Sequence, residues 1–256
     1  MVNWPLIEIQ PFVSGDNSAV SAIEAERNTI FSSISSFAAL VFVSSAAVEH
    51  FFCSPRGVAL PQVPCWVTGP GTSQALQKHG IPSHQIVSPP VNAPQFDSPQ
   101  LWEVAKNLVK AGESVLFVRG LDAESIGTHI SHQDTADTAD TADSVPSGSE
   151  WLMHQLRQHG VTVREIVVYL RCAPLWDEEQ KQRALKTVDQ GSIWIFSSSL
   201  SLQHLDRIIP QQDWSQARAI TTHKRIAQSA LDRGWGVVQV SRPTLGDVLT
   251  SLEYFY

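Results

Sequence analysis

Long hydrophobic runs are absent from this sequence. No stretch of the 256 residues approaches the roughly 18 to 20 apolar residues that span a bilayer. The first residues, Met1 to Pro5, also lack the basic segment and the apolar core of a signal peptide. We therefore expect a soluble, cytoplasmic protein that has no membrane partner.

Cysteines and basic residues are also scarce. The spacings of Cys53, Cys65 and Cys172 match neither a zinc site nor a redox Cys-x-x-Cys, so we expect buried free thiols and no metal. A total of 18 Lys and Arg against 25 Asp and Glu gives a formal net charge of -7, which argues against a nucleic-acid partner. An anionic small molecule remains compatible with this charge, because helix N-termini and a few local arginines bind carboxylates.

One pattern occurs twice along the chain. Residues 38–80 indicate an apolar strand, a serine corner, a helix, a short strand and a second helix, and residues 193–234 repeat this order. The two copies align with Ser44 opposite Ser197. The 43% apolar content, with 8 Trp and 10 Phe, is enough for two cores. The sequence therefore predicts a two-lobed protein with its site in the cleft.

Strands and helices that alternate with short turns indicate parallel sheets with right-handed crossovers. The expected fold class is α/β, with two similar α/β lobes. The two strands of the connector would be Pro5–Pro11 and the apolar run at 161–170. The inserted lobe would then span residues 12–165, and residues 1–11 and 166–256 would form the connector and a discontinuous second lobe.

A low-complexity segment interrupts this organisation. Residues Asp134–Asp143 repeat Asp-Thr-Ala, which has no apolar face to bury, and residues 144–149 extend the segment with Pro and Gly. We predict a disordered loop over residues 132–149 that has no catalytic role.

Serines follow the apolar strand of each copy. Ser44 and Ser45 in the first copy, and Ser197 and Ser198 in the second, stand where a hydroxyl caps a helix and free N–H groups hold an anion. Capping alone explains any one serine equally well, but the recurrence in both copies favours a ligand. Neither corner has the Gly-x-Ser-x-Gly pattern, and no His and acid suggest a triad, which argues against a hydrolase.

A glycine-rich turn precedes the second helix of the first copy. In Gly69-Pro70-Gly71-Thr72 the glycines permit close backbone approach, and Thr72 offers a hydroxyl near a helix that we expect to begin near Ser73. No Lys follows, so this is not a P-loop. The counterpart in the second copy is His223–Ile226, where Arg225 either grips a substrate carboxylate or is a solvated helix-start residue.

Two further positions lie where strands meet the expected cleft. Arg119 and Gly120 follow an apolar strand over residues 114–118, and ligands of α/β sheets bind at such carboxyl ends. Tyr169 ends another apolar run. It is either a core phenol with a satisfied hydroxyl or a proton donor that projects into the cleft, and the residues alone favour the core.

The order of these segments resembles the uroporphyrinogen-III synthase family, which closes the linear tetrapyrrole hydroxymethylbilane while inverting its last ring. The matching pieces are Pro5–Ile9, Val41–Val48, Val67–Thr72, Val115–Gly120, Val168-Tyr169, Ile195–Ser198 and Thr222–Ala227. Each piece is short, but their order and spacing extend over nearly the whole chain.

The resemblance implies two three-layer α/β/α lobes related by a swapped duplication and joined by a two-stranded connector. It also implies a lyase without a cofactor, whose cleft binds the polycarboxylate mainly through backbone N–H groups. It implies that Tyr169 helps the hydroxymethyl group leave as water, giving an azafulvene that cyclises through a spiro intermediate. It also implies a monomer that accepts substrate from hydroxymethylbilane synthase. The expected substrate-binding residues are Ser44, Ser45, Gly69, Thr72, Arg119, Gly120, Ser197, Ser198 and Arg225.

The chain departs from the family pattern at its start. The family begins with a strand ending in Thr-Arg-Pro and a helix, and neither precedes the Pro5–Ile9 piece here. We expect this departure to leave the discontinuous lobe a strand short, with exposed sheet edges. The alternative interpretation is therefore a two-lobed ligand-binding protein without catalysis, or an inactive truncated relative.

Overall fold

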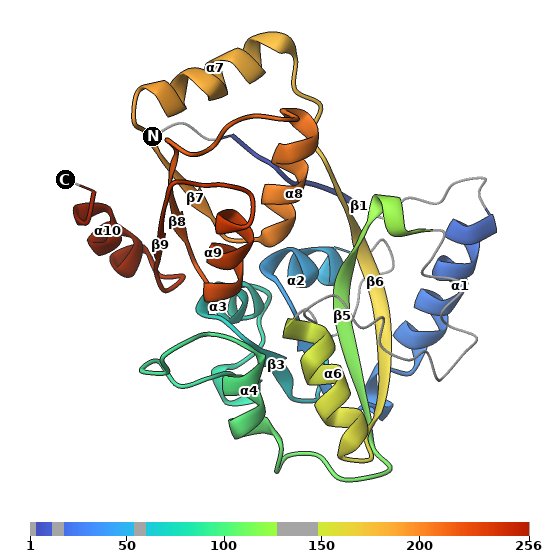
Figure 1. The fold of residues 1–256 in the computed structure, drawn as a ribbon. Coiled ribbons are helices and arrows are strands. Elements are labelled where there is room, and N and C mark those ends of the chain that lie inside the picture. Colours follow the sequence, from blue (N-terminus) through green and yellow to red (C-terminus); the bar gives the residue numbers. More distant parts are fainter. Residues whose placement is uncertain (1–3, 12–17, 54–59, 127–147, 256) are drawn as a thin grey trace. The chain divides into compact units, whose positions relative to one another are not determined.

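Parallel strands flanked by helices form two compact units of the chain (Figure 1). The computed structural model describes residues 4–11, 18–53, 60–126 and 148–255. Unit 1 comprises Met1–Glu8 and Cys172–Tyr256, and unit 2 comprises Ile9–Arg171. The mixed α/β class with parallel sheets is as predicted, whereas the predicted lobe limits of 12–165 stay a prediction.

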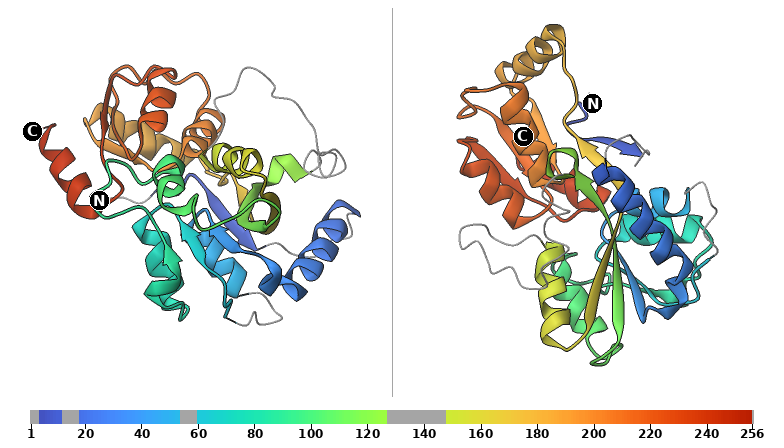
Figure 2. Two further views of the ribbon diagram at one scale, coloured as in Figure 1. Left: turned by 90° about the horizontal axis from the view of Figure 1, so that it is seen from below. Right: turned by 90° about the vertical axis from the view of Figure 1, so that its right-hand side faces the viewer.

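Unit 2 is built on a six-stranded sheet in the order β1-β6-β5-β2-β3-β4, and its strands from β6 to β4 run parallel. The long strands β5 and β6 lie side by side (Figures 1 and 2). The strands are β1 (Glu8–Pro11), β2 (Ala39–Phe42), β3 (Cys65–Val67), β4 (Ile86–Val87), β5 (Ser114–Asp122) and β6 (Thr162–Cys172). The helices are α1 (Ser18–Ser32), α2 (Ser45–Phe52), α3 (Pro70–Lys78), α4 (Ser98–Ala105) and α6 (Gly148–Gln158), with 3-10 turns η1 (Ile34–Ser36), η2 (Ser83–Gln85) and η3 (Ala123–Ser125).

Helices cover both faces of this sheet. On one face, Phe42 of β2 packs with Phe51 of α2 in a core to which α1 and α3 also contribute. On the other face, Val41, Trp66 and Phe117 pack with residues of α4 and α6. All four residues of β2 are buried, because successive side chains of this central strand enter the two cores alternately.

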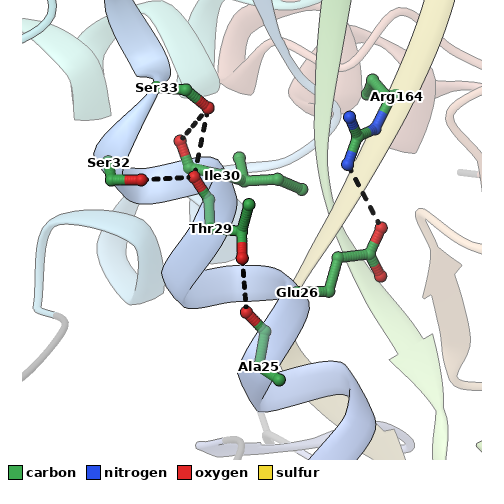
Figure 3. Close-up of polar contacts among 7 residues, drawn as sticks. All are labelled: Ala25, Glu26, Thr29, Ile30, Ser32, Ser33 and Arg164. Atoms are coloured by element: carbon green, nitrogen blue, oxygen red, sulfur yellow. Dashed lines mark hydrogen bonds and ion pairs between the residues drawn. The ribbon is translucent and has the colours of Figure 1, made fainter.

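Helix α1 is joined to β6 by an ion pair (Figure 3). The carboxylate of Glu26 lies 3.7 Å from the guanidinium of Arg164. At the end of α1, the hydroxyl of Ser33 donates to the carbonyl oxygens of Thr29 and Ile30 and so satisfies part of the last turn. The ion pair is partly exposed, so we assign it at most about 1 kcal/mol.

Unit 1 contains a three-stranded parallel sheet in the order β7-β8-β9. Its core is aromatic, with the rings of Trp214 and Trp235 stacked at 4.9 Å and Trp194 packed against both. The Nδ1 of His204 donates to the carbonyl oxygen of Leu6 at 2.6 Å, which holds the N-terminal segment on this unit. The elements are α7 (Glu178–Asp189), β7 (Ile193–Phe196), α8 (Ser199–Ile208), β8 (Arg218–Thr221), α9 (Lys224–Leu231), β9 (Val237–Val240) and α10 (Leu245–Glu253).

The internal repeat holds position by position. Ser44 caps α2 two residues after β2 ends, and Ser198 caps α8 two residues after β7 ends. Gly69 and His223 occupy the N-cap positions of α3 and α9, and each stands two residues after the preceding strand ends. Each pair is 154 positions apart, since 198 − 44 and 223 − 69 both give 154. The counterpart of Ser44 is therefore Ser198, one residue beyond the Ser197 that the sequence alignment chose.

Three element boundaries differ from the predicted ones. Helix α3 begins at Pro70 rather than near Ser73, because proline, which lacks an N–H, is well suited to a first helical position. Strand β5 continues through Arg119 and Gly120 to Asp122, since pairing with β6 sustains it. Helix α6 already includes residues 148–149 of the predicted loop 132–149, and the rest of that loop lies outside the described residues.

The cysteines are free, as predicted, but only one is buried. Cys65 is fully buried in β3, and burial raises the pKa of its thiol to about 12. Cys53 is exposed and Cys172 is half-buried, so the expectation of buried thiols was wrong for both. Within the described ranges, no helix is long and apolar enough to span a membrane.

Truncating a central strand residue tests the core of unit 2. Leu40 of β2 is fully buried, so Leu40→Ala should lower the free energy of unfolding by about 2–5 kcal/mol. Leu108→Ala is the matched control, because Leu108 is 53% exposed and its loss should change stability by less than about 0.5 kcal/mol. Urea unfolding followed by far-ultraviolet circular dichroism measures both, and equal losses would contradict the described packing.

Candidate functional site

The strand order of unit 2 reverses between β2 and β5. From β2 the chain proceeds to β3 and β4 on one side, and it then returns to β5 on the other side of β2. Open α/β sheets bind ligands at the carboxyl ends of their strands at such a reversal. Ser44 follows β2 here, and Gly120 lies on the neighbouring β5. The three described strands of unit 1 follow one another in chain order and show no such reversal.

Two helix N-termini lie together at this end of the sheet. The Oγ of Ser44 accepts a hydrogen bond from the backbone N–H of Ala47 at 3.0 Å and so caps α2. A Cβ placed on Gly71 in the first turn of α3 would lie 3.6 Å from the Oγ of Ser45, which places the two first turns in contact. Backbone N–H groups of this kind suit the carboxylates of an anionic ligand.

Gly69 and Thr72 complete the first turn of α3. Gly69 occupies the cap position in extended backbone, and no side chain there shields the N–H groups that follow. Helix α3 begins at Pro70, so Thr72 lies in its first turn rather than before it, contrary to the expected helix start, and Thr72 is only 8% exposed. The structure thus places Ser44, Ser45, Gly69 and Thr72 at neighbouring helix starts.

A bulge in β6 determines the face on which Tyr169 lies. Arg119 pairs with Val167, whereas the next residue Gly120 pairs with Tyr169, so Val168 is an extra residue on β6. Val168 and Tyr169 consequently enter the same core, the one covered by α1, α2 and α3. Regular alternation would have placed these successive side chains on opposite faces.

The phenol of Tyr169 crosses β5 to reach Ser44. Strand β5 lies between β6 and β2, so the backbones that carry the two residues are about 9.6 Å apart. The oxygens of the two hydroxyls nevertheless lie 3.1 Å apart, within hydrogen-bond distance. A Cβ on Gly120 would come within 2.3 Å of the Cε2 and Cζ atoms of the Tyr169 ring. The crossing therefore depends on glycine at position 120.

His50 of α2 lies beside the Tyr169 ring. The centroids of the two rings lie 5.5 Å apart. Burial lowers the pKa of His50; the neighbouring Glu49 opposes this shift and Arg27 adds to it. The imidazole beside the phenol is therefore neutral at neutral pH.

Arg119 is not brought together with the Ser44–Tyr169 pair. Its guanidinium forms a half-buried ion pair with Glu165 at 2.7 Å. Glu165 pairs along the sheet with Phe117, which belongs to the core on the face covered by α4 and α6. The ion pair engages one nitrogen of the Arg119 guanidinium, on the sheet face opposite to the Ser44–Tyr169 pair, so the predicted role of Arg119 in binding stays a prediction.

The remaining predicted residues belong to unit 1. Ser198 caps α8, accepting a hydrogen bond from the N–H of Leu200 at 3.2 Å, and Ser197 is exposed. The N–H of Arg225 donates to Nδ1 of His223 at 3.1 Å at the start of α9, and the Arg225 side chain is exposed.

Sequence reasoning missed His50 and Glu165. Neither stands in a motif, because each becomes relevant through a partner on a different element. The position of Gly120 in an apolar strand pattern could have indicated that another group approaches this strand closely, because glycine inside a strand often marks such a place.

Comparisons with known proteins give matches to one family. Residues 1–126 match a family model described as uroporphyrinogen-III synthase HemD. The chain resembles the uroporphyrinogen-III synthase family. No curated protein matches the sequence.

Two solved structures share the fold over almost the whole chain. Uroporphyrinogen-III synthetase from Helicobacter pylori aligns with a TM-score of 0.57 at 18% identity, covering 98% of this chain and 91% of that one. A mutant uroporphyrinogen III synthase from Thermus thermophilus aligns with a TM-score of 0.53 at 13% identity, covering 98% and 87%. At these identities the likeness shows the fold alone.

Adding a single methyl group at Gly120 tests the crossing. Gly120→Ala should displace the Tyr169 ring and destabilise the protein by about 1–3 kcal/mol, since the φ of Gly120 is not positive and the conflict is steric. In a Tyr169→Ala background the same substitution should cost less than about 0.5 kcal/mol. Gly246→Ala is the control, because no atom lies within 4 Å of the added Cβ. An equal cost of Gly120→Ala in both backgrounds, measured by urea unfolding, would show that the ring does not lie over Gly120.

The environment of His50 predicts a dependence of stability on pH. As the pH falls below the ordinary value of 6.5, the unfolded chain takes up a proton on His50 before the folded protein does, so the free energy of unfolding falls. His50→Gln should remove this part of the decline, whereas His84→Gln, at an exposed position, should leave it unchanged. Urea unfolding at about pH 5 to 8 measures the slopes, and a His50→Gln slope equal to that of the parent would contradict the assignment.

Proposed function

We propose that this chain is a uroporphyrinogen-III synthase, a lyase that converts hydroxymethylbilane to uroporphyrinogen III with inversion of ring D and loss of water. The observation that carries the proposal is the Tyr169 phenol held against Ser44 at the point where the strand order of unit 2 reverses. The family match over residues 1–126 and the shared fold support it.

The proposed substrate is a flexible chain with many carboxylates. In unit 2 the first turns of α2 and α3 offer backbone N–H groups that suit carboxylates, and in unit 1 the starts of α8 and α9 repeat this arrangement. We propose Ser44, Ser45, Gly69, Thr72, Arg119, Gly120, Ser197, Ser198 and Arg225 as the binding set. Binding fixes the orientation of the linear substrate, and this orientation favours ring closure with inversion of ring D over the spontaneous closure without inversion.

Chemistry begins with departure of the hydroxyl of the hydroxymethyl group. Its carbon–oxygen bond breaks while a proton supplied through Tyr169 turns the leaving group into water, and the pyrrole nitrogen provides the electron pair. The azafulvenium cation that remains returns its pyrrole N–H proton to the Tyr169 phenolate, and the neutral azafulvene then cyclises through a spiro intermediate. The reaction as proposed consumes no cofactor; a cytoplasmic location, a monomeric state and hand-over from hydroxymethylbilane synthase remain predictions.

One observation favours a second candidate, a ligand-binding protein without catalysis. Tyr169 is only 3% exposed and its hydroxyl already has a partner, as expected of a core phenol. A binding protein would use the same helix N-termini and would leave closure of the tetrapyrrole to the spontaneous reaction.

A coupled assay separates the two candidates. Hydroxymethylbilane is supplied to the purified chain, and uroporphyrinogen isomers III and I are separated after oxidation. The synthase should yield mainly isomer III, whereas isomer I alone, the product of spontaneous closure, would overturn the proposed function.

Removal of one oxygen atom tests Tyr169. Tyr169→Phe keeps the ring over Gly120 but removes the proton donor, so formation of isomer III should slow by about 100-fold or more. Tyr254→Phe, at a residue that is 69% exposed, is the matched control and should keep the parent rate. An unchanged rate for Tyr169→Phe in the same assay would remove Tyr169 from the mechanism.

A further inference from the structure

Ser44 is the accessible member of the Ser44–Tyr169 pair. Tyr169 is 3% exposed and lies in the core covered by α1, α2 and α3, whereas Ser44 is only half-buried, at the carboxyl end of β2. A substrate that arrives at this end of the sheet therefore meets the serine hydroxyl before the phenol.

The hydrogen bonds around Ser44 favour one direction of proton donation. A serine hydroxyl has two acceptor lone pairs and one proton. The N–H of Ala47 uses one lone pair at 3.0 Å, and the Tyr169 hydroxyl lies 3.1 Å away. The phenol proton is satisfied when it is donated to the Ser44 oxygen, its hydrogen-bond partner among the described residues. In this arrangement both lone pairs of Ser44 are used, and the Ser44 proton is available for donation to another acceptor.

The internal repeat distinguishes this arrangement from simple capping. Ser198, at the position equivalent to Ser44, caps α8 in the same way. In the part of unit 1 that the structure describes, its hydroxyl bonds only the N–H of Leu200 and no phenol. A cap therefore does not require a buried tyrosine behind it, and the phenol at Ser44 needs a separate explanation.

We propose that Ser44 is a catalytic residue, which gives its hydroxyl proton directly to the departing hydroxyl of the substrate. The Tyr169 hydroxyl then gives its own proton to the Ser44 oxygen. This relay rests on the proposed function and deepens it.

The relay balances in atoms and charge. The Ser44 O–H bond breaks as its proton passes to the substrate hydroxyl, and the Tyr169 proton moves to the Ser44 oxygen. The carbon–oxygen bond breaks, water leaves, and an azafulvenium cation and a phenolate remain. The pyrrole N–H proton then returns through Ser44 to the phenolate, which yields the neutral azafulvene and restores both hydroxyls.

The position of the phenolate fits this sequence of steps. Its oxygen lies beside the Ser44 cap at the N-terminus of α2, where the helix dipole and the orientation of the first N–H groups favour negative charge. The substrate cation forms on the other side of the serine, so charge separation is limited to the length of the relay.

A kinetic double-mutant cycle tests the relay in the isomer assay, with Ser44→Ala, Tyr169→Phe and the double variant measured under single turnover. Two residues that act as one unit have non-additive effects. Each single variant should lose about 100-fold in rate, and the double variant should be within about 3-fold of the slower single variant.

Two outcomes would overturn the relay: losses that multiply to about 10,000-fold in the double variant, or an unchanged Ser44→Ala rate. In both cases, isomer III from the parent leaves the proposed synthase function in place. A parent that gives only isomer I would overturn the proposed function and the relay together.

Further variants separate proton transfer from capping. Ser44→Thr keeps both the hydroxyl and the cap and should remain within about 10-fold of the parent, whereas Ser44→Asn keeps a capping oxygen but has no hydroxyl and should be as slow as Ser44→Ala. Asp97→Ala removes the cap of α4 and should keep the parent rate. In mixtures of light and heavy water, the parent rate should fall along a curve, as expected for two protons in motion. A straight line, or an active Ser44→Asn, would mean that Tyr169 acts without the serine.

Discussion

The missing side chain at Gly120 is the constraint on which the site depends. Three strands, β6, β5 and β2, carry the site, and a side chain on the middle strand would normally stand between the side chains of its two neighbours on the same face. With hydrogen at position 120, the Tyr169 ring lies across β5 and its hydroxyl reaches Ser44 at the end of β2. The bulge at Val168 is the second requirement, because it turns the ring toward the face on which α2 begins.

The two copies of the repeat share their capped helix starts, and one copy also has the Ser44–Tyr169 contact that is proposed to transfer protons. Both units place a capped helix two residues after an apolar strand, and both therefore present N–H groups at equivalent positions. Only unit 2 has a strand-order reversal beside the first of these caps and a tyrosine that contacts the capping serine, among the residues that the structure describes. Anion binding is thus a property of the repeated design, whereas proton transfer is specific to one copy.

Local patterns in the sequence predicted the features that depend on local chemistry. The strand–serine–helix corners were predictable because a hydroxyl after an apolar strand is a favourable cap, and Ser44 and Ser198 both act in this way. The full length of β5 was not predictable, since Arg119 and Gly120 interrupt its apolar run and the strand continues because it pairs with β6. The bulge leaves no trace in the uninterrupted apolar run that precedes Tyr169. The role of this tyrosine came from family resemblance, because the residues alone favoured a core phenol.

The most direct test of the Ser44–Tyr169 relay is the distance from the Ser44 Oγ to the nearest atom of a bound ligand. It can be measured in a crystal structure of the chain with uroporphyrinogen III bound under anaerobic conditions. A ligand atom should lie within about 3.5 Å of this oxygen, with Tyr169 still behind the serine and over Gly120. A ligand that contacts the Tyr169 hydroxyl directly, or that lies away from the carboxyl ends of β2 and β5, would contradict the relay.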